Sequence, residues 1–218
     1  SEPLVVLLHG WPGLPSDYDD VVARLTGVRC VVPALAGLGE EYTGPMPPGA
    51  ASADSHASRI LAALPEGVPL IAVGYDIGSR IAQAALRAAP GRFVGAVLTP
   101  GYPGIGDRAG DREVSAHFWY QHFHRTPVAA PLIDGRADAV RAYLGYLVDA
   151  WAADSLTRGP RFEEVVAAYA RPGAFEASIA WYGDNVGYMG TQLIDTPTTM
   201  LWPESDPLFP LDWADELG

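Results

Sequence analysis

Residues 70–82 constrain the fold more than any other part of the chain. They begin as an apolar run, reach the segment 74–78 (sequence GYDIG), and continue as an alanine-rich helical pattern. This order predicts a strand, a sharp turn and a helix, with small residues two positions on either side of Asp76. Glycine is needed where a strained turn packs closely on its neighbours. We therefore expect the Asp76 side chain to stand above the end of a buried strand.

An aspartate at the tip of such a turn predicts a nucleophile. Serine is the usual residue at this position. A carboxylate there would attack an electrophilic carbon and form an alkyl ester with the protein. The alternative is that Asp76 only caps the following helix. We favour the nucleophile because the sequence matches the strand–turn–helix pattern on both sides of Asp76.

The composition excludes several classes of function. With 218 residues, 49% of them hydrophobic and 18% charged, the chain is long enough for one globular domain with a sizeable core. The net charge is -12 and all 14 basic residues are arginine. We therefore expect no nucleic-acid partner, and without lysine we exclude a Schiff-base mechanism and the usual phosphate-binding loop. No apolar run approaches the roughly 20 residues that span a bilayer, and no basic region precedes residues 4–8, so we expect no signal peptide and no membrane partner.

Apolar runs alternate with helical patterns along the first hundred residues. Runs at residues 4–8, 28–32, 70–74 and 93–98 predict strands of an open parallel sheet with right-handed crossovers. A further strand is expected at 198–202. Between these runs, Ser16 is expected to cap a helix over residues 20–25, and a second helix to run over 52–64.

The loop after the first predicted strand reads His-Gly-Trp-Pro at residues 9–12. Ligands bind at the carboxyl ends of the strands in such sheets. We expect the backbone N–H groups of Trp11 and Ile77 to form an oxyanion hole, which stabilises negative charge on an oxygen during reaction. The alternative is an ordinary tight turn.

Residues 101–195 show a different pattern. Helices are predicted at 113–125, 135–155, 162–170 and 174–185, with no strand between them. This block is too long for a simple connection, and we expect a lid over the carboxyl ends of the strands that shields the site from water. The expected division is a core of residues 1–100 and 196–218 and a helical cap of residues 101–195.

Three segments give the chain a family resemblance: residues 9–12 (HGWP), 74–80 (GYDIGSR) and 202–210 (WPESDPLFP). With them the chain resembles the α/β-hydrolase superfamily, in particular the epoxide hydrolases that use an aspartate nucleophile and are related to haloalkane and fluoroacetate dehalogenases. The resemblance covers essentially the whole chain. It implies an α/β-hydrolase core with a mostly parallel sheet and an inserted all-helical lid. It also implies hydrolysis of an epoxide to a vicinal diol without a cofactor.

The resemblance also implies roles for individual residues. Asp206 would be the acid that orients a catalytic histidine, the less favoured alternative being a turn residue before proline. Tyr120 and Tyr182 would donate hydrogen bonds to the epoxide oxygen as charge develops there, the alternative being lid aromatics that only pack. A small, apolar substrate would be bound by aromatic lid residues: Trp119, Phe123 and Trp181.

Two other interpretations of the lid are weaker. A fluoroacetate-type dehalogenase would hold the halide with a histidine and a tryptophan. Here Phe118 precedes Trp119, and Ile77 directly follows Asp76, so that pocket is incomplete although Arg80 is nearby. Three lid histidines, at positions 117, 122 and 124, have no cysteine or carboxylate to complete a usual metal site, and we expect no metal.

The ends of the chain depart from the family. Members usually have two strands before Leu4, and a last strand and helix, with the triad histidine, after Gly218. We therefore expect the middle of a hydrolase or a truncated relative, and a non-catalytic binding protein stays an alternative. A homodimer is compatible with the sequence. The single Cys30 is compatible with a reducing cytoplasm.

Overall fold

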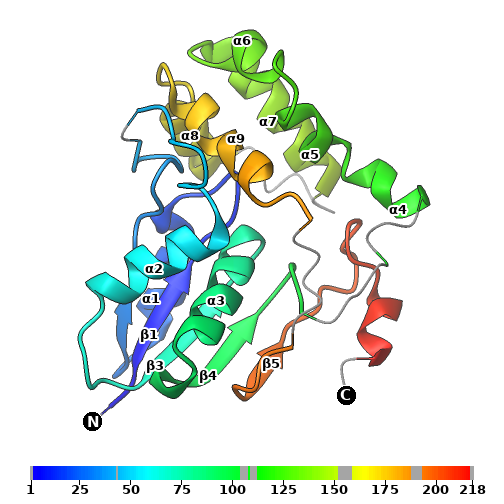
Figure 1. Ribbon diagram of the computed structural model, residues 1–218. Helices are drawn as coiled ribbons and strands as arrows, with labels where there is room; N and C mark the ends of the chain where they lie inside the picture. Colours follow the sequence, from blue (N-terminus) through cyan, green and yellow to red (C-terminus); the bar gives the residue numbers. More distant parts are fainter. Residues whose placement is uncertain are drawn as a thin grey trace.

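The computed structural model describes residues 2–42, 44–103, 108, 112–151, 159–187 and 193–216. Within these ranges, five parallel strands form one sheet in the order β2-β1-β3-β4-β5 (Figure 1). The strands are β1 (Leu4–Leu8), β2 (Arg29–Val31), β3 (Leu70–Gly74), β4 (Phe93–Leu98) and β5 (Thr198–Met200). The predicted α/β architecture with a parallel sheet is confirmed, and β1 and β4 have the predicted bounds.

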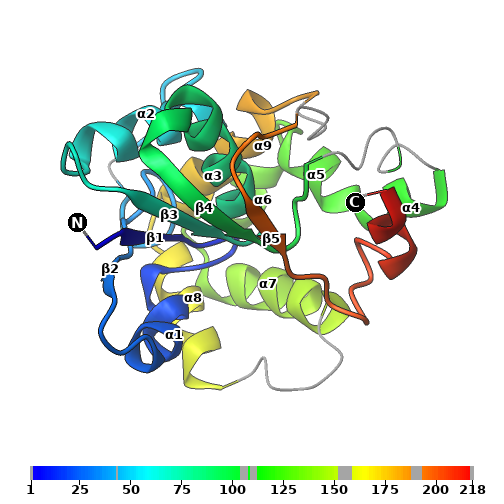
Figure 2. The ribbon, with the colours of Figure 1, turned by 90° about the horizontal axis from the view of Figure 1, so that it is seen from below.

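Strand β1 is buried on both faces, as its continuous apolar sequence predicts. Alternate side chains point to opposite faces of a strand. Accordingly, Val6 packs in the large core with Ile60 and Ile81, whereas Leu7 packs in a smaller cluster with Tyr18. Figure 2 shows helices α2 (Ala53–Ala63) and α3 (Ile77–Ala88) on one face of the sheet and α1 (Asp19–Arg24) on the other.

The starts of α2 and α1 differ in how they are capped. Ser52 is the N-cap of α2, where its hydroxyl accepts the N–H of Ser55 at 3.2 Å. The prediction that Ser16 caps a helix is wrong. Ser16 lies inside a 3₁₀ helix (Pro15–Tyr18) that leads directly into α1. Proline is favoured in the first turn of a helix because its missing N–H has no partner there anyway, so the helical turn begins before Ser16.

The second half of the chain forms a layer of helices beyond the carboxyl ends of the strands (Figure 1). We call it the helical layer; it consists of α4 (Arg112–His117), α5 (Trp119–His124), α6 (Ala129–Ile133), α7 (Ala137–Trp151), α8 (Pro160–Tyr169) and α9 (Ala174–Asp184). The helix expected over 113–125 is two helices separated at Phe118, and α6 was not expected. The predicted domain boundaries at residues 101 and 195 stay a prediction. No helix in the described ranges is long and apolar enough to cross a bilayer.

The end of α9 is bonded to the start of α2. Asp184 accepts the N–H of Ala51 at 2.9 Å, and the amide oxygen of Asn185 accepts the N–H of Ala53 at 2.9 Å. The amide nitrogen of Asn185 donates to the carbonyl of Ala51 at 3.1 Å. These bonds satisfy backbone groups that a helix start leaves without partners. They fix the helical layer to the sheet on the side of α2.

Gly78 marks the closest packing between α3 and β1. A methyl group at this position would overlap the backbone carbonyls of Leu8 and His9. We expect Gly78→Ala to lower the free energy of unfolding by about 3 kcal/mol, because the backbone of β1 cannot move aside. Urea unfolding followed by circular dichroism measures this effect.

Gly183 in α9 provides the matched control. A methyl group there meets no atom within 4 Å. Gly183→Ala should raise the free energy of unfolding by about 0.5–1 kcal/mol, since alanine favours the helix. Equal effects of the two changes would contradict the close packing at Gly78.

Candidate active site

Asp76 occupies a strained turn between β3 and α3. Its backbone has φ 54° and ψ −124°, and within the described residues no other non-glycine residue has a positive φ. Such a conformation is costly for a residue with a side chain and persists only where the surroundings enforce it. A methyl group on Gly74 would lie 2.5 Å from the carbonyl oxygen of Gly78. Both glycines of the elbow (residues 74–78) are therefore needed to form the turn.

Backbone donors hold the Asp76 carboxylate. The N–H of Trp11 donates to Oδ2 of Asp76 at 2.8 Å. Burial raises the pKa of Asp76, whereas hydrogen bonds from the backbones of Trp11 and Ile77 and the charge of Arg80 lower it. The structure thus brings the two expected oxyanion donors to the expected nucleophile. Trp11 lies in the loop of residues 9–14, which we call the oxyanion loop.

Two cavities meet at Asp76. The first has a volume of about 390 Å³ and the second about 410 Å³, and both are lined by Asp76, Tyr120 and Phe209. These volumes are typical of small-molecule sites. Trp181 and Tyr182 line the first cavity, together with polar residues: Arg80, Ser115, Gln121, His122, Arg125 and Asn185. The lining of the second is mostly apolar: Trp11, Tyr75, Pro100, Trp151, Pro203, Ser205, Asp206, Pro207 and Leu208.

The two predicted tyrosines lie together in the first cavity, which Asp76 also lines. The ring centroids of Tyr120 on α5 and Tyr182 on α9 are 5.8 Å apart, with the rings nearly perpendicular. The Trp11 ring is parallel to Tyr120 at 6.2 Å and edge-on to Tyr182 at 5.7 Å. Burial raises the pKa of both phenols. They therefore stay protonated at neutral pH and can donate hydrogen bonds into the first cavity.

The structure does not bring Trp119 and Phe123 to the cavities that touch Asp76. Trp119 is 40% exposed, and its ring packs against Phe123 and Tyr143 with centroids 6.2 Å and 6.1 Å apart. The helix break at Phe118 accounts for this arrangement, since Phe118 lines the first cavity in place of its neighbour. Phe118 and Phe209 are lining residues that the sequence analysis missed. Phe209 lies in the family-like segment of residues 202–210, so a signal for it was present, whereas Phe118 lies outside the three segments.

Asp206 lies in the loop after β5 and lines the second cavity with Asp76. Its Oδ1 accepts the N–H groups of Leu208 at 2.7 Å and Phe209 at 3.0 Å, which is an aspartate turn. Burial raises the pKa of Asp206 and these two bonds lower it. Asp206 thus forms the turn that was the alternative interpretation of this residue. The role as triad acid stays a prediction.

The histidines of the described residues make no hydrogen bond to Asp76 or Asp206. His9 is buried, with Nδ1 3.0 Å from the carbonyl oxygen of Gly10. His124 is buried with Nε2 2.7 Å from the hydroxyl of Tyr143, and burial lowers its pKa to about 3. The same described residues contain no group of three or more histidine, cysteine or acidic side chains that could hold a metal ion.

Comparison with known proteins defines the family. The sequence matches the alpha/beta hydrolase family over residues 5–218, so the chain belongs to this family. None of the curated proteins matches the sequence.

Solved structures share the fold at low sequence identity. An epoxide hydrolase from metagenomes of hot environments is 18% identical with a TM-score of 0.80, and the match covers 100% of this chain and 79% of that one. The epoxide hydrolase of Bacillus megaterium is 13% identical with a TM-score of 0.77, covering 100% and 81%. A Salmonella enterica protein provisionally named an acyltransferase is 20% identical with a TM-score of 0.76, covering 94% and 72%. The likeness therefore concerns the fold.

The half-buried carboxyl of Asp76 predicts a pH-dependent stability. Burial raises its pKa above the ordinary 3.8, so the folded state binds this proton more tightly than the unfolded state. The stability that this provides is fully present below about pH 3.8 and is lost as the pH rises through the folded-state pKa. Asp76→Asn should therefore raise the free energy of unfolding at pH 7, and raise it less at about pH 4.

Urea unfolding of the parent and Asp76→Asn at both pH values checks this. Glu66→Gln is the matched control, because Glu66 is an exposed turn residue. It should change the free energy of unfolding little at either pH. A destabilised Asp76→Asn at pH 7, or a difference that does not depend on pH, would contradict the prediction.

Proposed function

We propose that this hydrolase opens an epoxide to a vicinal diol through an ester of Asp76. One observation carries the proposal: a carboxylate held by a backbone donor at 2.8 Å faces a cavity that it shares with two buried phenols, Tyr120 and Tyr182. Nucleophile, oxyanion donors and proton donors are the groups that this reaction needs. The shared fold with proteins named epoxide hydrolases supports the choice.

In the first step, an oxygen of Asp76 attacks one carbon of the epoxide. The bond between that carbon and the epoxide oxygen breaks, and its electron pair stays on the oxygen. Because an alkoxide is a poor leaving group, Tyr120 and Tyr182 donate hydrogen bonds to this oxygen as the charge develops, and one of the two phenols transfers its proton to it. That phenolate regains a proton when water hydrolyses the ester. The product is a 2-hydroxyalkyl ester of Asp76.

In the second step, water attacks the carbonyl carbon of the ester. The N–H groups of Trp11 and Ile77 stabilise the negative charge on the former carboxylate oxygen. Collapse of this intermediate releases the diol and restores the carboxylate. The step needs a general base for the water proton, and Asp206 would orient a histidine for that purpose.

A specific observation disfavours the dehalogenase alternative. That alternative needs Trp119 beside the nucleophile to hold a halide. Trp119 instead packs on the outside of the helical layer, against Tyr143 and Tyr146.

The tyrosine pair provides the test. Tyr120→Phe and Tyr182→Phe each remove one hydrogen bond to the transition state with little change in shape. Each should raise the barrier by about 1.5 to 4 kcal/mol, which slows epoxide opening roughly tenfold to several hundredfold. The double change should be far slower than either. Consumption of an aryl epoxide, measured by chromatography with protein in excess, gives these rates.

Two control variants make the result specific. Asp76→Asn should not react at all, provided that mass spectrometry shows the amide has not hydrolysed back to aspartate. Tyr146→Phe should react at the parental rate, because Tyr146 is 61% exposed and lines neither cavity. If both single changes and the double change leave the rate unaltered, the two tyrosines have only a packing role. If the parent protein is folded but opens no epoxide, the result favours a non-catalytic binding protein.

A further inference from the structure

The oxyanion loop has no regular structure of its own to keep Trp11 in place. The N–H of Trp11 reaches Asp76 at 2.8 Å only while the loop keeps its position beside the elbow. The side chains that fix the loop come from three places: α8, α9 and the elbow itself.

Tyr169, in the last turn of α8, holds the loop two residues after Trp11. Its hydroxyl donates to the carbonyl oxygen of Gly13 at 3.1 Å and accepts the N–H of Gly13 at 3.3 Å. A hydroxyl is both donor and acceptor, so one side chain satisfies both backbone groups of this glycine. Tyr169 is completely buried. Because water cannot replace its hydroxyl there, the loop depends on it.

Ser178, on α9, holds the Trp11 side chain. The indole N–H of Trp11 donates to the Ser178 hydroxyl oxygen at 3.1 Å, and that hydroxyl donates to the carbonyl of Phe175 at 2.8 Å. Both side chains are buried. Since the indole ring and the backbone N–H belong to one residue, fixing the ring restricts where the N–H can point.

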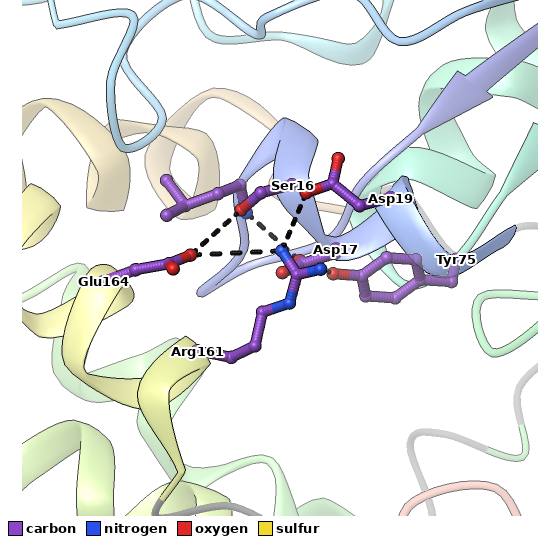
Figure 3. A network of polar contacts seen from close by, with 7 residues as sticks. Ser16, Asp17, Asp19, Tyr75, Arg161 and Glu164 are labelled. Carbon is purple, nitrogen blue, oxygen red and sulfur yellow. Dashed lines mark hydrogen bonds and ion pairs between the residues drawn. The ribbon is translucent and has the colours of Figure 1, made fainter. Parts of the chain in front are cut away.

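The far end of the loop is linked to the elbow through the side chain of Asp17. The hydroxyl of Tyr75, the residue before Asp76, donates to Oδ2 of Asp17, which also accepts the N–H of Leu14 at 3.1 Å (Figure 3). A methyl group on Gly13 would collide with both the Asp17 carboxylate and the Tyr75 hydroxyl. The loop is therefore packed between the elbow and the helical layer.

Surface charges add a weaker connection next to this one. Arg161 on α8 pairs with Asp19 at 3.3 Å, and Ser16 donates to Glu164 at 3.5 Å (Figure 3). Exposed pairs of this kind contribute little. The buried bonds of Tyr169 and Ser178 are the ones expected to position the loop.

We propose that Tyr169 and Ser178 are positioning residues for the oxyanion donor of Trp11. Through their hydrogen bonds, α8 and α9 determine where the backbone N–H of Trp11 lies. This N–H in turn orients and stabilises the carboxylate of Asp76. The expected effect of these two residues on epoxide opening rests on the proposed function. The Trp11–Asp76 contact itself is independent of the substrate.

The first test is the rate of epoxide opening in Tyr169→Phe, Ser178→Ala and the double variant. Misplacing the donor should slow the reaction with an aryl epoxide roughly ten- to hundredfold with protein in excess, while the protein concentration that gives half the maximal rate changes little. Without the hydrogen bond from Trp11, the carboxyl of Asp76 ionises less readily. In the variants, the pH at which the reaction rate rises should therefore be higher than in the parent. A merely structural role would not move this pH profile.

The second test does not depend on any reaction. Carbon-13 NMR of labelled aspartate, with the Asp76 signal assigned by its loss in Asp76→Asn, gives the pKa of this carboxyl directly. We expect a higher pKa than in the parent in both variants, because the Trp11 hydrogen bond is weakened. An unchanged pKa in the folded variants would overturn the proposal.

Matched controls separate positioning from general destabilisation. Tyr18→Phe removes a buried tyrosine hydroxyl that donates to the carbonyl of Leu8 at 3.0 Å, and Ser52→Ala removes the cap of α2. Neither should move the pKa of Asp76. If Tyr169→Phe does not fold, Ser178→Ala, which leaves the tyrosine in place, decides the question.

The two tests also separate this inference from the proposed function. A parent that opens no epoxide, with a raised Asp76 pKa in the variants, contradicts the function and leaves the positioning role standing. A reactive parent whose pKa and pH profile do not change in the variants overturns the positioning role alone.

Discussion

The close contact between the elbow and the oxyanion loop is the constraint on which the site depends. Asp76 can adopt φ 54° only because the glycines around it let three backbone segments approach each other. A methyl group on Gly78 would overlap the end of β1, and one on Gly10 would lie 2.8 Å from Cβ of Asp76. This absence of side chains brings the N–H of Trp11 to 2.8 Å from the carboxylate. The strained turn and the oxyanion donor are thus two results of one packing arrangement.

That arrangement places a charge where burial disfavours it. Burial raises the pKa of Asp76, and only the backbone bonds of Trp11 and Ile77 and the charge of Arg80 act in the opposite direction. A partly desolvated carboxylate is a better nucleophile, and its fixed donors would also stabilise later charge on the same group. Under the proposed function, the protein therefore gives up stability at the residue where reactivity is needed. The helical layer contributes by holding the oxyanion loop through the hydrogen bonds of Tyr169 and Ser178.

The sequence predicted those parts that depend on local pattern. Residues 4–8 and 93–98 are strands with the predicted bounds because buried parallel strands read as continuous apolar runs. The aromatic segment 118–123 was less informative, since bulky side chains on every side of a helix do not reveal which face is buried. Its break at Phe118 turned Trp119 away from the site. Contacts such as Tyr169 to Gly13 join residues far apart in the chain and leave no local signal at all.

The most direct test of the account is to find where an epoxide becomes attached. The parent is mixed with a reactive aryl epoxide, quenched rapidly in acid and digested at arginine, which places Asp76 in the peptide of residues 60–80 together with one other carboxyl side chain, Glu66. The account predicts one added substrate mass on the intact chain, assigned to Asp76 by fragmentation and absent from Asp76→Asn. An adduct on another residue, or an equal adduct in Asp76→Asn, would contradict the assignment of Asp76 as the nucleophile.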